Sequence, residues 1–371
     1  MLNKLYGDGI NDDTAAIQEL IDTVGSELVL PLAKAFYLIS RPLELPSNFR
    51  LVLPRFCEIR LAAGSNCVMA KNKEDNAQNI EICGGVWNFN NKAQNPNPIL
   101  TGVFEPEGYI GFGMAFFGVK GLRLTSMTMK DPVTFAVTLD TVSYFTVDNI
   151  VFDFNYGNPL ATNMDGIHLN GNCHFGEITN LKGACYDDLV ALNADEGTAG
   201  EISDITIRGI YSEDCHSAVR LLSANHPVRN VHISDVYGTY FQYCIGITRF
   251  YQSLDKGIFD AITLENICAS KAERIPVYNK KPDDYVYPLI FVENKLRISS
   301  LKVSCVFRRE FINEVETVYV GEETKINSLV LENINVQNFV SDNEIPVFVN
   351  SGEIKNLYSK ELYNNGKKVL L

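Results

Sequence analysis

The sequence lacks a long hydrophobic run: no apolar stretch approaches the ~20 residues that span a membrane. It also has fewer basic than acidic residues, 32 Lys and Arg against 45 Asp and Glu, which gives a net charge of −13. These two features argue against a membrane association and against nucleic acid or an anionic membrane surface as the main partner. An acidic substrate is still compatible with this balance, because positive charge in a cleft can locally override the overall sign.

Paired cysteine motifs are missing as well. The nine cysteines are spread singly and no C-x-x-C occurs, so neither a zinc site nor a redox pair is indicated. We expect reduced, mostly buried thiols, no metal and no other cofactor. The opening MLNKLYGDGINDDT has no apolar segment or cleavage site typical of a secretory signal. We therefore expect a cytoplasmic protein, or an extracellular one if a leader has been removed.

One segment has the pattern of an amphipathic helix, residues 12–24, DDTAAIQELIDTV. Its apolar residues recur at helical spacing, at Ile17, Leu20, Ile21 and Val24. Asp12 or Asp13 can cap its first turn. The preceding GDG lacks the further glycines of a phosphate loop and the spacing of a calcium loop. The segment therefore predicts a capped helix.

After residue 28 the sequence changes to short β-rich runs that repeat one phrase, an apolar pair beside a polar anchor, as in KGLRLTSMTM, SDITIRGIYSED and DAITLENICA. The first apolar anchors of successive phrases lie 23 to 36 residues apart, at Leu122, Phe145, Ile178, Ile205, Val231, Ile262, Ile298, Leu329 and Ile354. Helical repeats do not fit these short β-branched runs, and a sandwich gives turn signals every ~8–12 residues without a recurrent phrase.

We therefore predict an all-β fold, a single-stranded right-handed parallel β-helix. No linker rich in Pro, Gly or Ser divides the chain, so residues 1–371 are predicted to form one domain. The helix at residues 12–24 would then cover the open apolar end of the stack.

Two adjacent aspartates, Asp187 and Asp188, stand before the apolar run LVAL, where burial of carboxylates is costly. Asp165 precedes Asp187 by 22 residues, about one repeat. His216 follows Asp188 by 28 residues, and Arg249 follows His216 by 33. Because residues one coil apart stack at the strand spacing of ~4.7–4.9 Å, these five are predicted to line one face of the β-helix.

These motifs resemble those of the polygalacturonase-like glycoside hydrolases, family 28, within the pectin-lyase-like β-helix superfamily. The similar segments are NMDG at 163–166, DD at 187–188, CHS at 215–217 and ITR at 247–249. The opening GDGINDDTAAIQ is similar to the N-terminal cap of such enzymes, and GGVWNFNN to a glycine-rich coil that they share. The resemblance covers most of residues 6–260.

The resemblance implies an inverting hydrolase of oligo- or polysaccharides that are pectin-like or contain uronic acids. It assigns proton donation to Asp187 and the holding of the water to Asp165 and Asp188. A carboxyl flanked by two others also keeps its proton longer, as an acid catalyst must. The expected substrate-binding residues are Asn163, His168, His216, Arg220 and Arg249, with His168 equally readable as a stacked structural residue. Ile247 stands where the family has an arginine, and Arg220 can supply a substitute charge.

Two other functions fit the same architecture. In a polysaccharide lyase or epimerase the acids would bind calcium, and an arginine or lysine would abstract a proton. No lysine lies among the aligned coils, which disfavours this alternative. In a non-catalytic carbohydrate-binding β-helix, the alignment of the acids would be accidental.

Overall fold

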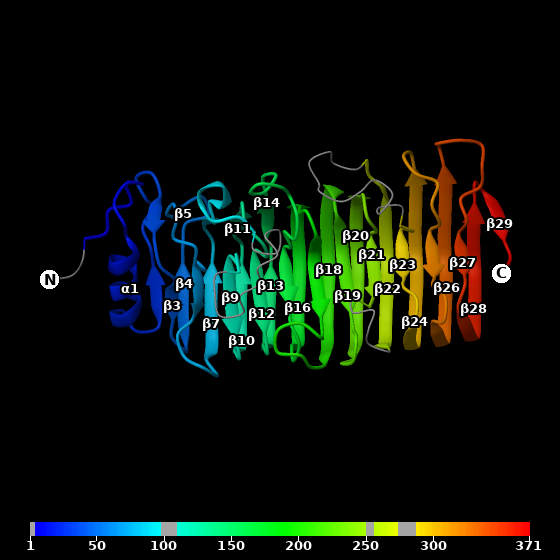
Figure 1. Ribbon diagram of the computed structural model, residues 1–371, viewed down its shortest axis with the longest axis horizontal. Coiled ribbons are helices and arrows are strands. Elements are labelled where there is room, and N and C mark those ends of the chain that lie inside the picture. The colour runs from blue at the N-terminus through cyan, green and yellow to red at the C-terminus, as the bar shows by residue number, and fades with distance from the viewer. Residues whose placement is uncertain (1–3, 98–109, 250–255, 274–286) are drawn as a thin grey trace.

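The computed structural model describes residues 4–97, 110–249, 256–273 and 287–371. The chain folds as a right-handed parallel β-helix, as predicted, with the N-terminus at one end of the stack and the C-terminus at the other (Figure 1). Within the described residues, no helix has the length and apolar character needed to cross a membrane.

The coils stack into two sheets, and the strand pairings of the described residues are all parallel except that between the last two strands. The smaller sheet contains β3 (Leu43–Leu45), β6 (Ala70–Asn72), β9 (Met114–Phe117), β12 (Val137–Asp140), β15 (Ile167–Leu169), β17 (Asp188–Asn193), β19 (Ser217–Leu222), β21 (Ile245–Thr248), β23 (Ile290–Val292), β25 (Val318–Val320) and β27 (Phe348–Asn350).

The larger sheet wraps around the remaining sides of the coils. It contains β1 (Glu27–Val29), β2 (Tyr37–Ile39), β4 (Phe49–Val52), β5 (Glu58–Leu61), β7 (Gln78–Cys83), β8 (Val86–Asn88), β10 (Lys120–Thr125), β11 (Thr128–Lys130), β13 (Ser143–Asp148), β14 (Val151–Asp153), β16 (His174–Ala184), β18 (Ile202–Cys215), β20 (Val228–Tyr240), β22 (Gly257–Lys271), β24 (Leu296–Glu310), β26 (Lys325–Asn338), β28 (Glu353–Asn364) and β29 (Lys367–Val369). A 3₁₀ turn, η1, spans Asn91–Ala93.

The same backbone bend recurs at one position of successive coils. The residues there have a left-handed φ and are Asn48, Asn79, Gly121, Tyr144, Phe175, Asp204, Asn230 and Ala261. Asparagine is among the residues that adopt this conformation at least cost. The side chains also link coils, since Asn79 Nδ2 donates to Asn48 Oδ1 at 2.7 Å. The repeated Asn of the sequence phrases thus marks a corner of the β-helix.

The predicted column of apolar anchors is correct at Leu122 and Phe145 and wrong at the next coil. Gly176, not Ile178, pairs with Phe145. The Phe145 ring fills the space that a side chain would need, because a Cβ on Gly176 would lie 2.0 Å from it. Further along, the paired residues are Leu301 and Leu357 rather than Ile298 and Ile354. Sequence phrases therefore locate the coils and give the register correctly at six of nine anchors, and they miss it by two or three residues at Ile178, Ile298 and Ile354.

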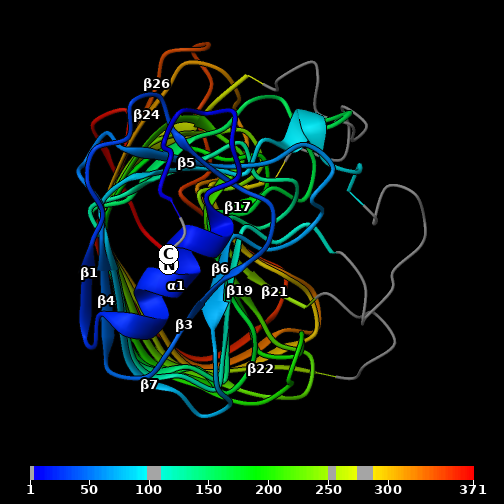
Figure 2. The ribbon, with the colours of Figure 1, turned by 90° about the vertical axis from the view of Figure 1, so that its left-hand side faces the viewer.

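Helix α1 spans Thr14–Thr23 and lies across the N-terminal end of the coils (Figure 2). Ile17 and Ile21 are buried against the first coils, so the helix covers apolar surface that the stack would otherwise expose. It begins two residues later than predicted because Asp12 accepts a bond from the Thr14 N–H at 2.8 Å. Asp13 turns instead toward the preceding loop and accepts from the Tyr6 N–H at 2.6 Å.

Candidate active site

The acidic motifs meet at the beginnings of neighbouring strands of the smaller sheet. Asp165 lies two residues before β15, Asp188 begins β17, and Ser217 begins β19. The register places Asp165 beside Asp188, and the Gly166 N–H donates to the Asp188 carbonyl oxygen at 3.1 Å. The predicted stacking of these acids on adjacent coils is therefore confirmed.

His216 lies one coil beyond Asp187, because Asp188 pairs with the residue after His216. The next position in that column is Gln242, whose N–H donates to the His216 carbonyl oxygen at 3.0 Å. The prediction that Arg249 stands there is wrong. Arg249 follows the end of β21 and approaches the same groove from the far end of that strand.

Asp188 is buried and its two oxygens have different partners. Oδ1 accepts a hydrogen bond from the Ser217 hydroxyl, and Oδ2 lies 3.7 Å from Nη1 of Arg220. Burial raises the pKa of Asp188 well above its ordinary value, the Asp187 charge raises it further, and Arg220 opposes the shift. Asp188 therefore retains a proton to higher pH than an exposed aspartate.

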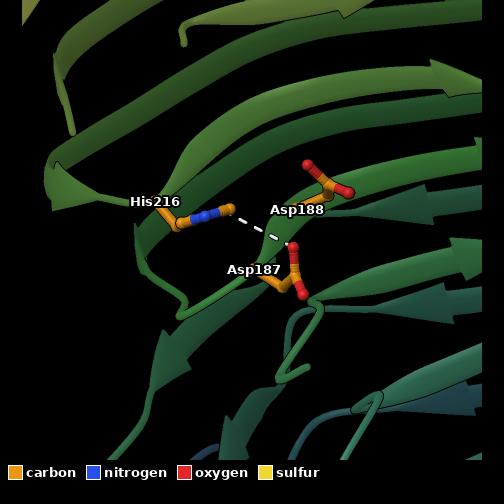
Figure 3. Close-up of side chains that lie close together, drawn as sticks. All are labelled: Asp187, Asp188 and His216. Carbon is orange, nitrogen blue, oxygen red and sulfur yellow. Dashed lines mark ion pairs between the residues drawn. The ribbon is translucent and has the colours of Figure 1, made fainter. Parts of the chain in front are cut away.

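Asp187 differs from its neighbour in reaching solvent, since its side chain is 16% exposed and lines the groove. The imidazole of His216 points toward it from the next coil, with Nδ1 at 3.5 Å from Oδ1 (Figure 3). His216 is itself fully buried, with its ring set edge-on to Phe241 at 5.0 Å. Among the three aspartates, Asp187 is the one that lines the groove.

Asp165 and His168 form a buried pair at the start of β15. Asp165 Oδ2 lies 2.6 Å from His168 Nδ1, and the other ring nitrogen, Nε2, lies 3.2 Å from Oε2 of Glu196. Burial raises the pKa of Asp165, and the bond from His168 opposes the rise. Burial lowers the pKa of His168, but the two carboxylates outweigh it and bring it to about 10. His168 is only 1% exposed, so any effect on a substrate passes through Asp165.

Glu196 was not found from the sequence. It lies in the turn NADEGTAG after β17, where a polar run is typical of a loop. Burial raises its pKa, but the bond to His168 and the charges of His168 and Arg220 outweigh this and hold the pKa below its ordinary value. Its contact with His168 crosses between coils, which no spacing within the turn reveals.

A groove of about 490 Å³ opens beside the acids. Asn163 lines it with a left-handed φ of 52°, and its Nδ2 is buried without a hydrogen-bond partner among the described residues. The other lining residues are Asp187, Arg220, Gln242, Tyr243, Thr248, Arg249, Tyr287, Phe291, Glu293, Asn294, Tyr319, Gly321 and Glu322. The groove thus combines one acid of the cluster with two arginines and several aromatic rings.

The two arginines are held in different ways. Arg220 donates from Nε to Thr248 Oγ1 at 2.9 Å and faces Asp188. Arg249 is buried, and its backbone N–H donates to Oε2 of Glu293 at 2.5 Å. Both bring fixed positive charge to the groove of an otherwise acidic protein, as a carboxylate-bearing ligand requires.

Asp187, Asp188 and His216 also bring one ligand atom each to within 4.8 Å of one another. Carboxylate and imidazole groups at this separation could hold a divalent cation. This is the one such group found among the described residues.

Comparison with solved structures shows the same fold in proteins of different function. The family 28 exopolygalacturonase of Yersinia enterocolitica matches with a TM-score of 0.62 and 13% identity, over 98% of this chain and 77% of that protein. A tailspike protein mutant of E. coli bacteriophage HK620, in complex with a pentasaccharide, matches with a TM-score of 0.64 and 13% identity, over 96% and 63%. PfbA, a surface adhesin of Streptococcus pneumoniae, matches with a TM-score of 0.52 and 13% identity, over 96% and 91%.

At these identities the structural matches show the fold alone. No curated protein matches the sequence. Residues 4–240 do match a family described as Rhamnogalacturonase A/epimerase, pectate lyase-like. This segment is more than half of the 371 residues and contains Asp165, Asp187, Asp188 and His216. The protein therefore belongs to the rhamnogalacturonase A/epimerase, pectate lyase-like family.

Proposed function

We propose that this protein is an inverting glycoside hydrolase that cleaves oligo- or polysaccharides containing uronic acids, of the pectin type. The observation that carries the proposal is the division of three adjacent carboxyl groups. Asp187 reaches the groove, whereas Asp165 and Asp188 are buried behind it with raised pKa values. Protonation of a glycosidic oxygen needs a carboxyl group at the substrate and a proton held close to it.

Asp188, whose pKa is raised by burial, holds a proton beside Asp187. Asp187 delivers the proton to the leaving oxygen because, of the three aspartates, it is the one that lines the groove. Of the two buried carboxyl groups, Asp165 is the better able to stay ionised, since it accepts a bond from His168 and its pKa is raised less than that of Asp188. It takes the proton of the water that attacks the anomeric carbon as the glycosidic bond breaks.

Arg249 and Arg220 on the groove wall would bind the carboxylate of the substrate. A guanidinium group can bind a carboxylate with two parallel hydrogen bonds, which an acidic groove needs to overcome repulsion. Asn163 adds a buried amide donor at the same wall. Aromatic rings such as Phe291 offer an apolar surface to sugar rings.

The test is to incubate the protein with a panel of oligogalacturonides and mixed rhamnose–galacturonate oligosaccharides in water enriched in a heavy oxygen isotope. Hydrolysis adds one labelled water per cleavage, which mass spectrometry detects. Proton NMR of the first product shows whether the new reducing end has the inverted configuration. Binding without cleavage on every member of the panel would contradict the proposal and favour a recognition protein.

A lyase is the second candidate, and the cation-sized cluster of Asp187, Asp188 and His216 is the observation that favours it. Elimination would give an unsaturated product without labelled oxygen. It would also require calcium, so a chelator would abolish it, whereas the proposed hydrolysis would continue in the chelator.

A further inference from the structure

His168 is bound on both sides by carboxylates. Nδ1 lies 2.6 Å from Asp165, Nε2 lies 3.2 Å from Glu196, and the ring is 1% exposed. Its orientation is fixed by stacking on Phe135, with ring centroids 3.8 Å apart and planes 5° from parallel. A tilt of the ring out of this plane would lose the stacking contact.

The protonation state follows from counting hydrogens. A neutral imidazole carries one N–H and so can donate to only one acceptor. An ionised carboxylate can only accept. With an ionised carboxylate at each nitrogen, both nitrogens must carry a hydrogen, and the ring is an imidazolium. Removing the carboxylate at Nε2 removes the need for the second hydrogen.

We propose that Glu196 is a positioning residue for the hydrolysis: by accepting the Nε2 hydrogen it holds His168 as an imidazolium, which keeps Asp165 ionised and oriented as the base. The inference rests on the proposed function for its catalytic consequence, whereas the state of His168 can be measured without any substrate. Glu196 touches no reacting atom in this scheme and acts through His168.

The turn that carries Glu196 is built into the stack. Asp140 Oδ2 accepts from the Thr198 N–H at 2.9 Å and from Asn170 Nδ2 at 3.0 Å. The Glu196 backbone is tied to the strand before it, with its N–H donating to the Asn193 carbonyl oxygen at 3.3 Å. These bonds fix the carboxylate at a set distance from His168.

Other charged groups surround this network. Asp187 raises the pKa of Asp165 from the next coil, and Arg220 from the coil beyond lowers that of Glu196. Asn193 Nδ2, a neutral group, lies 3.5 Å from His168 Nε2. Of the acids in the described part of the chain, Asp165 and Glu196 are the two recorded within hydrogen-bond or ion-pair distance of the ring nitrogens.

The experiment is Glu196→Gln, which keeps the shape of the side chain and removes its charge. The imidazole signals of the five histidines are followed by NMR against pH, and that of His168 is assigned by its loss in His168→Gln. In Glu196→Gln the pKa of His168 is expected to fall by about one to three pH units, the size expected when one close counter-charge is removed. Loss of the imidazolium raises the pKa of Asp165, so the acid limb of kcat/KM moves to higher pH.

Asp195→Asn is the matched control, because it removes the neighbouring carboxylate of the same turn. Asp195 binds His226, with Oδ1 2.7 Å from Nδ1, and not His168. This variant should leave the His168 titration and the acid limb in place. Glu196→Asp retains the charge on a shorter side chain and should keep the His168 titration and the acid limb of kcat/KM close to those of the wild type. If Glu196→Gln does not fold, Glu196→Asp should still show a small shift of the His168 pKa in the same direction.

An unchanged His168 titration in Glu196→Gln would overturn the inference. So would a shifted titration with an unshifted acid limb, because Asp165 would then not be the base that His168 controls. Failure of the wild-type protein to hydrolyse any oligosaccharide would reject the proposed function, and the NMR titration would still decide whether Glu196 sets the protonation of His168.

Discussion

Among the described residues, two networks of charged side chains are built differently. The site network contains Asp165, Asp187, Asp188 and Glu196 with His168 and Arg220. The C-terminal network contains Lys271, Arg308 and Glu310, at the ends of β22 and β24. The first has more acids than bases and faces a groove, whereas the second is enclosed.

In the C-terminal network, each charge has several partners. Arg308 Nη2 lies 2.7 Å from Oε2 of Glu310, and the side chains of these two residues are 0% exposed. Arg308 also donates to the carbonyl oxygens of Val315 and Asn313. Glu310 also accepts from the Ile312 N–H at 3.0 Å. Such a set fixes local structure, because every donor and acceptor is used within the protein.

In the site network, the excess of acids leaves protons to be shared, so its components are suited to proton transfer rather than to stability. Asp188 and Asp165 both have raised pKa values, for which burial is the largest cause. Burial of charge thus has two uses in one fold. Where each charged group has close partners it holds the chain, and where acids exceed bases it prepares an acid and a base.

The largest expected effect separates the two networks most directly. Asp187→Asn should lower kcat by about 10²–10⁴-fold, because the amide cannot donate an acidic proton to the leaving oxygen. The free energy of unfolding should stay unchanged or rise slightly, since repulsion between carboxyl groups is removed. The loss should be smaller for substrates with good leaving groups, which need less protonation.

Steady-state kinetics and denaturant unfolding of the same preparation measure both quantities. Asp153→Asn, at an aspartate that is 60% exposed, is the control and should change neither. Full activity of Asp187→Asn on natural oligosaccharides would show that another group is the acid.

Glu310→Gln should have the opposite signature. Loss of one partner of a buried ion pair leaves Arg308 uncompensated and should lower the free energy of unfolding by about 3–5 kcal/mol. The activity of the folded protein should change little. Urea unfolding measures the loss, and Glu353→Gln, which breaks an exposed pair with Lys325, should leave the free energy of unfolding nearly unchanged. Equal losses in the two variants would mean that the enclosed network does not stabilise the fold.

The sequence predicted those parts of the site that follow from strand spacing. Asp165 and Asp188 lie on adjacent coils as expected, because the segment between them is one short coil. Arg249 does not lie in the column of His216 as its spacing predicts, because the paired strands align Gln242 with His216. Glu196 was missed because its contact is made from a turn across coils.

Packing explains why the anchor column was also only partly predictable. At Gly176 the space is filled by the ring of Phe145 from the preceding coil, so an apolar residue is not needed there. A pattern of apolar residues cannot show that a neighbouring coil supplies the missing side chain. Fold and coil order are thus predictable from repetition, but exact register depends on contacts between coils.

Arg249→Ala is expected to have a smaller effect, limited to charged substrates. A charge-assisted bond to a substrate carboxylate is worth roughly 1.5–3 kcal/mol, or about ten- to a hundredfold in kcat/KM. A uronide substrate should lose this factor and its neutral-sugar analogue almost nothing. Arg229→Ala, at an exposed arginine paired with Glu201, is the control. Equal losses on both substrates would show that Arg249 supports the groove wall rather than reading charge.

An effect that depends on pH concerns Lys271, which joins the enclosed network to the groove. Its ammonium group donates to the backbone carbonyl oxygens of Gln242 and Tyr287, two residues of the groove wall. Burial, and then the charge of Arg308, lower the pKa of Lys271 to about 7 from an ordinary 10.5. Below about pH 7 both the folded and the unfolded chain carry this proton, and burial of the charge lowers the free energy of unfolding by its full amount.

Between about pH 7 and pH 10 the unfolded chain binds a proton that the folded protein does not, so this lysine makes stability rise with pH, by at most roughly 1.4 kcal/mol per pH unit. Lys271→Met should remove that rise. Its unfolding free energy should exceed that of the wild type most at about pH 6 and approach it near pH 10. Denaturant unfolding at both ends of the range measures the difference, and Lys256→Met, at an exposed lysine, should run parallel to the wild type. If the curve of Lys271→Met also ran parallel to that of the wild type, the buried lysine would keep its proton over this pH range. The enclosed network would then hold Lys271 in its charged form.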